Sequence, residues 1–146
     1  MRTLLTDSAE RAIAYLESLD GRPVAPMAID RLDALDRPLP AHPTPPEEVL
    51  RELDEIGSPA TMAMAGPRFF GFVIGGALPV ALAANWLAGA WDQNSALYNV
   101  TPATAQVERI ALEWLVSLFG LPAGTGGGFV TGATMANFTA LAAARY

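Results

Sequence analysis

Apolar residues recur at helical spacing in several stretches of this chain. The first stretch covers residues 9–19, where apolar side chains stand three and four positions apart. Asp7 or Ser8 is a suitable N-cap for this helix, and Gly21 is a suitable end. The opposite face is charged, so we expect an amphipathic helix whose apolar side lies on other protein.

The helix pattern is clearest in residues 101–120. Thr101 is a suitable N-cap, Pro102 suits the first helical position, and Gly120 suits the end. The apolar positions between them follow the helical series and are Val107, Ile110, Ala111, Trp114, Leu115 and Leu118.

Two further helices and two short strands are predicted. Residues 44–57 open with threonine and proline, followed by two glutamates that favour a helix start, and residues 78–92 have a proline in their first turn. The short apolar run 68–74 favours a strand or an extended segment, and the run 128–131 favours a brief buried strand. The proline-rich residues 22–46 are expected to form an extended connector.

Charge is concentrated in the first part of the chain. Residues 1–55 hold twelve of the fifteen acidic residues and six of the nine basic ones. Hydrophobic residues make up 51% of the whole chain, which excludes a disordered protein. We therefore expect residues 56–146 to be buried, against themselves or against protein outside this chain.

The composition also limits the chemistry. A net charge of -6 argues against a nucleic-acid partner. Without cysteine, the chain can form no disulfide or thiolate metal site, and the single His42 lies in the connector without a second histidine. All nine basic residues are arginine, so the chain contains no lysine that could form a Schiff base.

Residues 69–91 carry no charge and are long enough to cross a bilayer. Pro79, Asn85 and several glycines interrupt this run, so we favour a buried segment of a larger water-soluble protein and no membrane partner; a membrane span is the alternative. The first twenty residues are charged and amphipathic, unlike a secretory signal. We expect a cytoplasmic location.

The last stretch, "GGGFVTGATMANFTALAAARY", places a turn of small residues between a predicted strand and a helix starting at Thr134. Free backbone N–H groups at a helix start bind anions, commonly phosphate. Gly132 and Ala133 permit close approach, and glycine also tolerates left-handed backbone. Thr134 either adds a hydroxyl donor for a ligand or caps its own helix. The residues alone leave both interpretations open.

Five stretches, in order, resemble the group II pyridoxal-5′-phosphate-dependent decarboxylases, which act on aromatic amino acids, glutamate, histidine or diaminobutyrate. They are "AIAYLESLDGRPVAP", "PTPPEEVLREL", "GPRFFGFVIGGALPVALAANWLAGAWDQN", "VTPATAQVERIALEWLVSLFGLP" and "GGFVTGATMANFTALAAARY". The resemblance implies an α/β fold of the aspartate-aminotransferase-like type (fold type I), of which this chain is the N-terminal, mostly helical part.

The resemblance also implies site residues. The segment with Gly132, Ala133 and Thr134 would bind the phosphate of pyridoxal 5′-phosphate. The segment with Phe72 and Gly75 would line the substrate side of the pocket. Some relatives have threonine where Gly75 stands, so the resemblance does not identify the amino-acid substrate.

By the same resemblance, residues 1–58 form a helical arm and connector, and residues 59–146 begin the large cofactor-binding domain. The arm implies a homodimer. The implied activity is decarboxylation of an L-amino acid, with the lysine, carboxylate and histidine of the complete site lying beyond this chain. Gly66 replaces the family's usual histidine. The alternative is a non-catalytic helical module that binds a partner through its apolar face.

Overall fold

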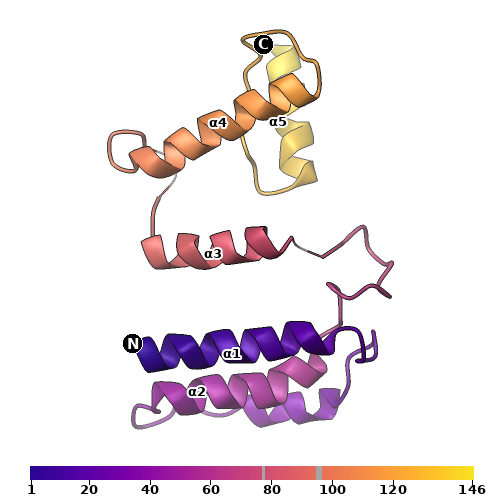
Figure 1. Ribbon diagram of the computed structural model, residues 1–146, viewed down its shortest axis with the longest axis vertical. Coiled ribbons are helices and arrows are strands. Elements are labelled where there is room, and N and C mark those ends of the chain that lie inside the picture. The colour runs from indigo at the N-terminus through magenta and orange to yellow at the C-terminus, as the bar shows by residue number, and fades with distance from the viewer. Residues whose placement is uncertain (77, 95–96) are drawn as a thin grey trace. The chain divides into compact units, whose positions relative to one another are not determined.

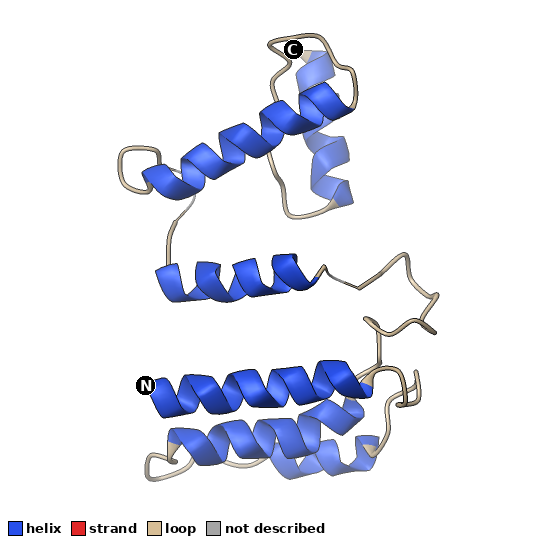
Figure 2. Cartoon of the chain, viewed as in Figure 1, coloured by secondary structure: helices blue, strands red, loops and turns tan. Residues whose placement is uncertain are grey.

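The computed structural model describes residues 1–76, 78–94 and 97–146. These residues form helices joined by loops, and no strand occurs among them (Figure 2). The chain divides into two compact units, Met1–Leu82 and Ala83–Tyr146, and each is described by itself.

The first unit is built around two helices that lie side by side, α1 (Arg2–Ser18) and α2 (Pro46–Glu52) (Figure 1). A 3-10 helix, η1 (Ile29–Leu35), lies between them in the sequence. After α2 the chain continues through a π-helical turn, η2 (Leu53–Gly57), and a 3-10 turn, η3 (Ser58–Ala60). The predicted helix over 44–57 is therefore present, but its second half is π-helical.

Two details of the first unit differ from the sequence predictions. α1 begins at Arg2 with Met1 as its cap, so neither Asp7 nor Ser8 caps it. Nothing in residues 2–6 breaks a helix, so the helix extends back past both candidates. The connector is not extended throughout, because η1 forms in a stretch that contains no proline.

Few side chains are buried in the first unit. Its buried hydrophobic residues are Leu19, Ile56 and Ala63. Two long-range backbone hydrogen bonds support this small core: the N–H of Met27 donates to the carbonyl of Pro59 at 2.9 Å, and that of Ala63 to Val24 at 3.1 Å. The connector is thereby held against the segment that follows α2.

Polar side chains join α1 to η2. Arg11 Nε donates to both carboxylate oxygens of Asp7, at 3.1 and 3.0 Å, and its Nη1 donates to Asp54 Oδ2 at 3.0 Å. These hydrogen bonds raise the pKa of Arg11, and the one to Asp7 has a larger effect than the one to Asp54. Ser58 Oγ donates to the other oxygen of Asp54 at 2.5 Å. The contact between α1 and η2 is therefore largely ionic.

The apolar stripe of α1, which we define as Leu5, Ile13 and Leu16, is left exposed. These side chains are 60%, 48% and 39% exposed. At about 100° per residue they fall within a sector of about 80°, beside the small Ala9 and Ala12. The predicted amphipathic helix is present. Hydrogen bonds from Arg11 to Asp54 and between Tyr15 and Thr61 join it to its unit, while this stripe remains largely in contact with solvent.

The helix α3 (Pro79–Trp91) begins in the first unit and ends in the second. It confirms the helix predicted over 78–92, with Pro79 in the first turn. Although it lies in the uncharged run, it has only 13 residues. Within the described residues no helix combines the length and the apolar character that a membrane crossing requires.

The second unit also contains α4 (Pro102–Leu118) and α5 (Ala133–Arg145). Pro102 occupies the first helical position of α4, as predicted. Thr101 is buried but is not a side-chain cap, because its hydroxyl instead donates to the carbonyl of Leu97, at 3.0 Å. That carbonyl lies in the preceding turn, where it also accepts the N–H of Thr101 at 2.8 Å.

The two predicted strands, 68–74 and 128–131, are wrong. A strand needs a neighbour to accept and donate its backbone hydrogen bonds, and the described residues offer no such neighbour. The first segment is a turning loop, in which Phe72 and Val73 adopt positive φ angles of 57° and 55°. Its apolar character therefore marks a surface without a partner.

Almost all apolar side chains of the second unit are exposed. Residues 117–146 are exposed throughout, and Trp114 and Leu141 are 72% and 71% exposed. A folded monomer seldom leaves so much contiguous apolar surface in water. The exposed apolar side chains agree with the expectation that residues 56–146 pack against protein outside this chain.

We expect the two units to differ in local stability. In hydrogen exchange of the isolated chain, peptides from α1 and η2 should remain protected after peptides from α5 have exchanged completely. The reason is that α5 has no buried residue, whereas η2 contains Ile56 and an ionic link to α1. Equal protection of α5 and η2 would contradict this assignment.

Candidate functional site

The turn before α5 leaves backbone N–H groups without intrahelical partners. Gly132 is the cap residue, and the first helical hydrogen bond runs from the N–H of Ala136 to the carbonyl of Gly132, at 3.0 Å. The N–H groups of Ala133, Thr134 and Met135 precede that bond and have no carbonyl one turn earlier. The positive end of the α5 dipole is therefore open to an anion.

Thr134 does not act as the cap of its own helix. It is the second residue of α5, and no side-chain hydrogen bond caps this helix. The residue is exposed. The sequence left open whether the Thr134 hydroxyl binds a ligand or caps its own helix. The structure shows no capping hydrogen bond from this hydroxyl.

Gly132 leaves open space at the same turn. Its φ of 164° and ψ of 177° describe extended backbone, so tolerance of the left-handed region is not the reason for glycine here. A Cβ atom at this position would meet no heavy atom within 4 Å. The turn thus has room for a group that approaches the backbone, as a phosphate does.

The second predicted pair, Phe72 and Gly75, lies in a loop that we call the substrate loop, residues 69–76. Phe72 is 78% exposed, and its ring stacks on that of Phe69, with centroids 6.5 Å apart. A Cβ at Gly75 would meet nothing within 4 Å. Left-handed backbone at Phe72 and Val73 costs on the order of 1 kcal/mol or more for each residue.

Gly66, three residues before the substrate loop, and Gly76, the last residue of the loop, lie close to other backbone. A Cβ at Gly66 would lie 3.2 Å from the carbonyl oxygen of Ala63 and 3.5 Å from that of Leu19. A Cβ at Gly76 would lie 3.3 Å from the carbonyl oxygen of Ala65. Glycine at position 66 therefore permits a close backbone approach that a side chain at this position would disturb.

The predicted site residues fall into the two separate units. Phe72 and Gly75 belong to the first unit, and the turn at Gly132 belongs to the second. His42 is exposed in the connector. Among the described residues no group of three or more histidine, cysteine, aspartate or glutamate side chains could hold a metal ion.

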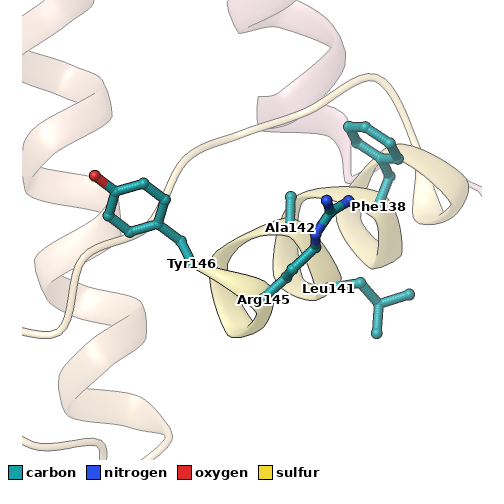
Figure 3. Close-up of a pocket in the computed structure, with 5 residues that line it drawn as sticks. All are labelled: Phe138, Leu141, Ala142, Arg145 and Tyr146. Carbon is teal, nitrogen blue, oxygen red and sulfur yellow. The ribbon is translucent and has the colours of Figure 1, made fainter.

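A shallow hollow lies along α5, and the sequence analysis did not single it out. Its lining residues are Phe138, Leu141, Ala142, Arg145 and Tyr146. Figure 3 shows Phe138, Leu141 and Arg145 projecting from the helix, and Tyr146 from the end of the chain. All five come from α5 or the residue after it, so the hollow is an uncovered helix surface. Its signal in the sequence is the spacing of Phe138, Leu141 and Arg145 at helical intervals.

The fold of the chain matches that of a solved structure. The crystal structure of mouse CSAD aligns with 99% of this chain, with a TM-score of 0.85 and 22% sequence identity, and the chain covers 31% of that protein. This similarity confirms the predicted fold class: the chain has the fold of the N-terminal portion of an aspartate-aminotransferase-like, fold type I α/β protein. In this portion the described residues form helices joined by loops.

The family follows from the sequence. The model of the pyridoxal-dependent decarboxylase conserved domain matches residues 28–146. The chain therefore belongs to the family of pyridoxal-phosphate-dependent decarboxylases, as its ordered motifs indicated.

Relatives in this family come from animals, plants and bacteria. Aromatic-L-amino-acid decarboxylase of Mus musculus is 31% identical over 144 residues, covering 90% of this chain and 29% of the mouse protein. Tryptophan decarboxylase 1 of Oryza sativa subsp. japonica is 28% identical, over 99% of this chain and 31% of the rice protein. Aromatic-L-amino-acid decarboxylase of Bacillus atrophaeus is 28% identical, with the same coverages of 99% and 31%. The chain thus spans less than a third of the length of these relatives.

Proposed function

We propose that this chain forms the N-terminal part of a pyridoxal-5′-phosphate-dependent carboxy-lyase that decarboxylates an L-amino acid. The observation that carries the proposal is the family match over residues 28–146, which includes the open helix start at α5. The bound cofactor would supply an electron sink for the electrons released as CO2 leaves. The chain has no lysine, so the covalent attachment of the cofactor would come from residues outside it.

Within this proposal, the chain binds and orients the cofactor phosphate. The N–H groups of Ala133 and Thr134 would donate to phosphate oxygens, and the hydroxyl of Thr134 would add a third donor. Gly132 leaves the space that the phosphate needs. The first turn of α5 contains no acidic residue, so no carboxylate of that turn repels the anion.

The substrate would lie against the substrate loop. Phe72 presents an exposed aromatic ring, and Gly75 leaves open space beside it. An apolar lining of this kind suits an amino acid with a large side chain. The proposed division into a helical arm, residues 1–58, and the start of the cofactor-binding domain, residues 59–146, belongs to the same proposal, as does a cytoplasmic location.

The activity is tested on the complete protein loaded with pyridoxal 5′-phosphate. We expect CO2 release from at least one L-amino acid in a panel that begins with aromatic substrates, because the relatives are named for them. The panel should also include acidic amino acids. A protein that binds the cofactor but releases CO2 from no amino acid would favour the non-catalytic helical module instead.

The role of Thr134 is tested by Thr134→Ala in the complete protein. Loss of one hydrogen bond to a charged group should weaken cofactor binding by about 1–3 kcal/mol. Equilibrium dialysis with fluorescence detection of the free cofactor measures this loss without relying on activity.

Thr139→Ala is the matched control for that experiment. Thr139 lies on the same helix, and its hydroxyl donates to the carbonyl of Met135, at 2.8 Å. The same chemical change there should leave cofactor binding unaltered. Equal affinities for wild type, Thr134→Ala and Thr139→Ala would show that the Thr134 hydroxyl does not bind the phosphate.

We also propose that a second copy of the chain covers the apolar stripe of α1, giving a homodimer through the N-terminal arm. Arg2 lies near one end of the stripe, and Glu17 lies near the other. Two α1 helices that pack antiparallel about a two-fold axis would place Leu5 of one copy opposite Leu16 of the other. The same arrangement brings Arg2 near Glu17 of the other copy, so the surface is self-complementary in charge.

Charge exchange tests this arrangement in the complete protein. Arg2→Glu removes both symmetry-related ion pairs, so it should weaken dimerisation by about 0.4–2 kcal/mol, roughly two- to thirtyfold, and adding Glu17→Arg should restore it. Ile13→Asp should weaken it more strongly, because it places a charge in the stripe. Sedimentation equilibrium measures all three. Arg31→Glu, a charge reversal on η1, is the control, and a loss of the same size in that variant would contradict the proposed interface.

A further inference from the structure

Arg68 connects the base of the substrate loop to the end of α1. Its Nη2 donates to the carbonyl oxygen of Asp20 at 3.1 Å and to that of Arg22 at 2.5 Å. Both acceptors belong to the turn that follows α1, which ends at Ser18. A single guanidinium nitrogen from a distant loop therefore fixes this turn.

The turn to which Arg68 donates, at Asp20 and Arg22, is itself bound to other parts of the first unit. Arg22 donates through Nη2 to the carbonyl of Ser58, and its guanidinium carbon lies 4.7 Å from the centre of the Tyr15 ring. Leu19, at the start of the turn, is buried. The turn is thus an anchored point to which the loop is attached.

Beyond its base, the substrate loop has few contacts of its own. Phe70, Phe72 and Val73 are 91%, 78% and 107% exposed. Phe72 and Val73 nevertheless hold left-handed backbone, which bulky and β-branched residues avoid unless their surroundings impose it. The turn that contains them is closed by its own hydrogen bond, from the N–H of Ile74 to the carbonyl of Gly71 at 3.2 Å. Arg68 and the close approaches of Gly66 and Gly76 fix the segments that lead into and out of this turn.

We propose that Arg68 is a positioning residue for substrate binding. It holds the substrate loop in the conformation that presents Phe72 and Gly75, without touching the substrate itself. The inference rests on the proposed function, because that function gives the loop its role. We infer further that substrate affinity depends on the hydrogen bonds between Arg68 and the turn that follows α1.

The test uses the complete, cofactor-loaded protein and the variants Arg68→Ala and Arg68→Lys. We expect Arg68→Ala to raise KM about three- to tenfold, the scale of one or two lost hydrogen bonds, with kcat within about twofold and cofactor binding unchanged. Arg68→Lys retains a charged donor and should recover part of the loss. Arg37→Ala is the control, because Arg37 makes an ion pair of 2.5 Å with Glu52 elsewhere in the same unit.

Hydrogen exchange of the peptide spanning residues 69–76 gives a second readout that does not require activity. Exchange should become faster in Arg68→Ala and stay unchanged in Arg37→Ala. An unchanged KM in Arg68→Ala would overturn the positioning role. So would a rise in KM that comes with a lower kcat, weaker cofactor binding and a lower melting temperature, because that pattern indicates general destabilisation. If the wild type releases CO2 from no amino acid, the proposed function and the claim on substrate affinity both fail, and exchange of the loop still decides whether Arg68 positions it.

Discussion

Apolar surface without cover is the physical constraint that governs this chain. Among the described residues of the first unit, the buried hydrophobic ones are Leu19, Ile56 and Ala63, and in the second unit residues 117–146 are exposed throughout. Burial of apolar area is the main favourable term in folding, so a chain with so little of it depends on other contacts or on other protein. The stability of the folded chain therefore depends on what covers the exposed apolar surfaces of α1 and α5.

Directional polar contacts give the first unit its order in place of a large core. Arg11 and Asp54 join α1 to η2. Arg68 donates to carbonyls of the turn after α1, and Arg22, in that turn, donates to the carbonyl of Ser58. Arginine suits this work because its planar guanidinium carries several donors and stays charged. The same contacts determine where the substrate loop begins, so the stability of the arm and the geometry of the candidate site depend on one network.

The sequence predicted the helices well, because each depends on a local period and on nearby residues. Pro102 starts α4, and the extent of α3 follows from its apolar run and Pro79. The caps were predicted poorly. Thr101 donates to the carbonyl of Leu97, and Asp7 pairs with Arg11, because a polar side chain binds whichever partner the fold brings nearest. The same local pattern could not reveal that Arg68 reaches Asp20 across 48 positions.

By itself the sequence indicated the family, the helix positions and the turn of small residues at Gly132, because each depends on short motifs in a fixed order. Only the tertiary structure decided that the runs 68–74 and 128–131 are loops, that α1 contacts its unit through polar side chains, and that Thr134 leaves its own helix uncapped. The physical reason is range. Period and turn residues act over one or two helical turns, whereas strand pairing, the choice of packed face and the partner of a hydroxyl depend on groups that are distant in the chain.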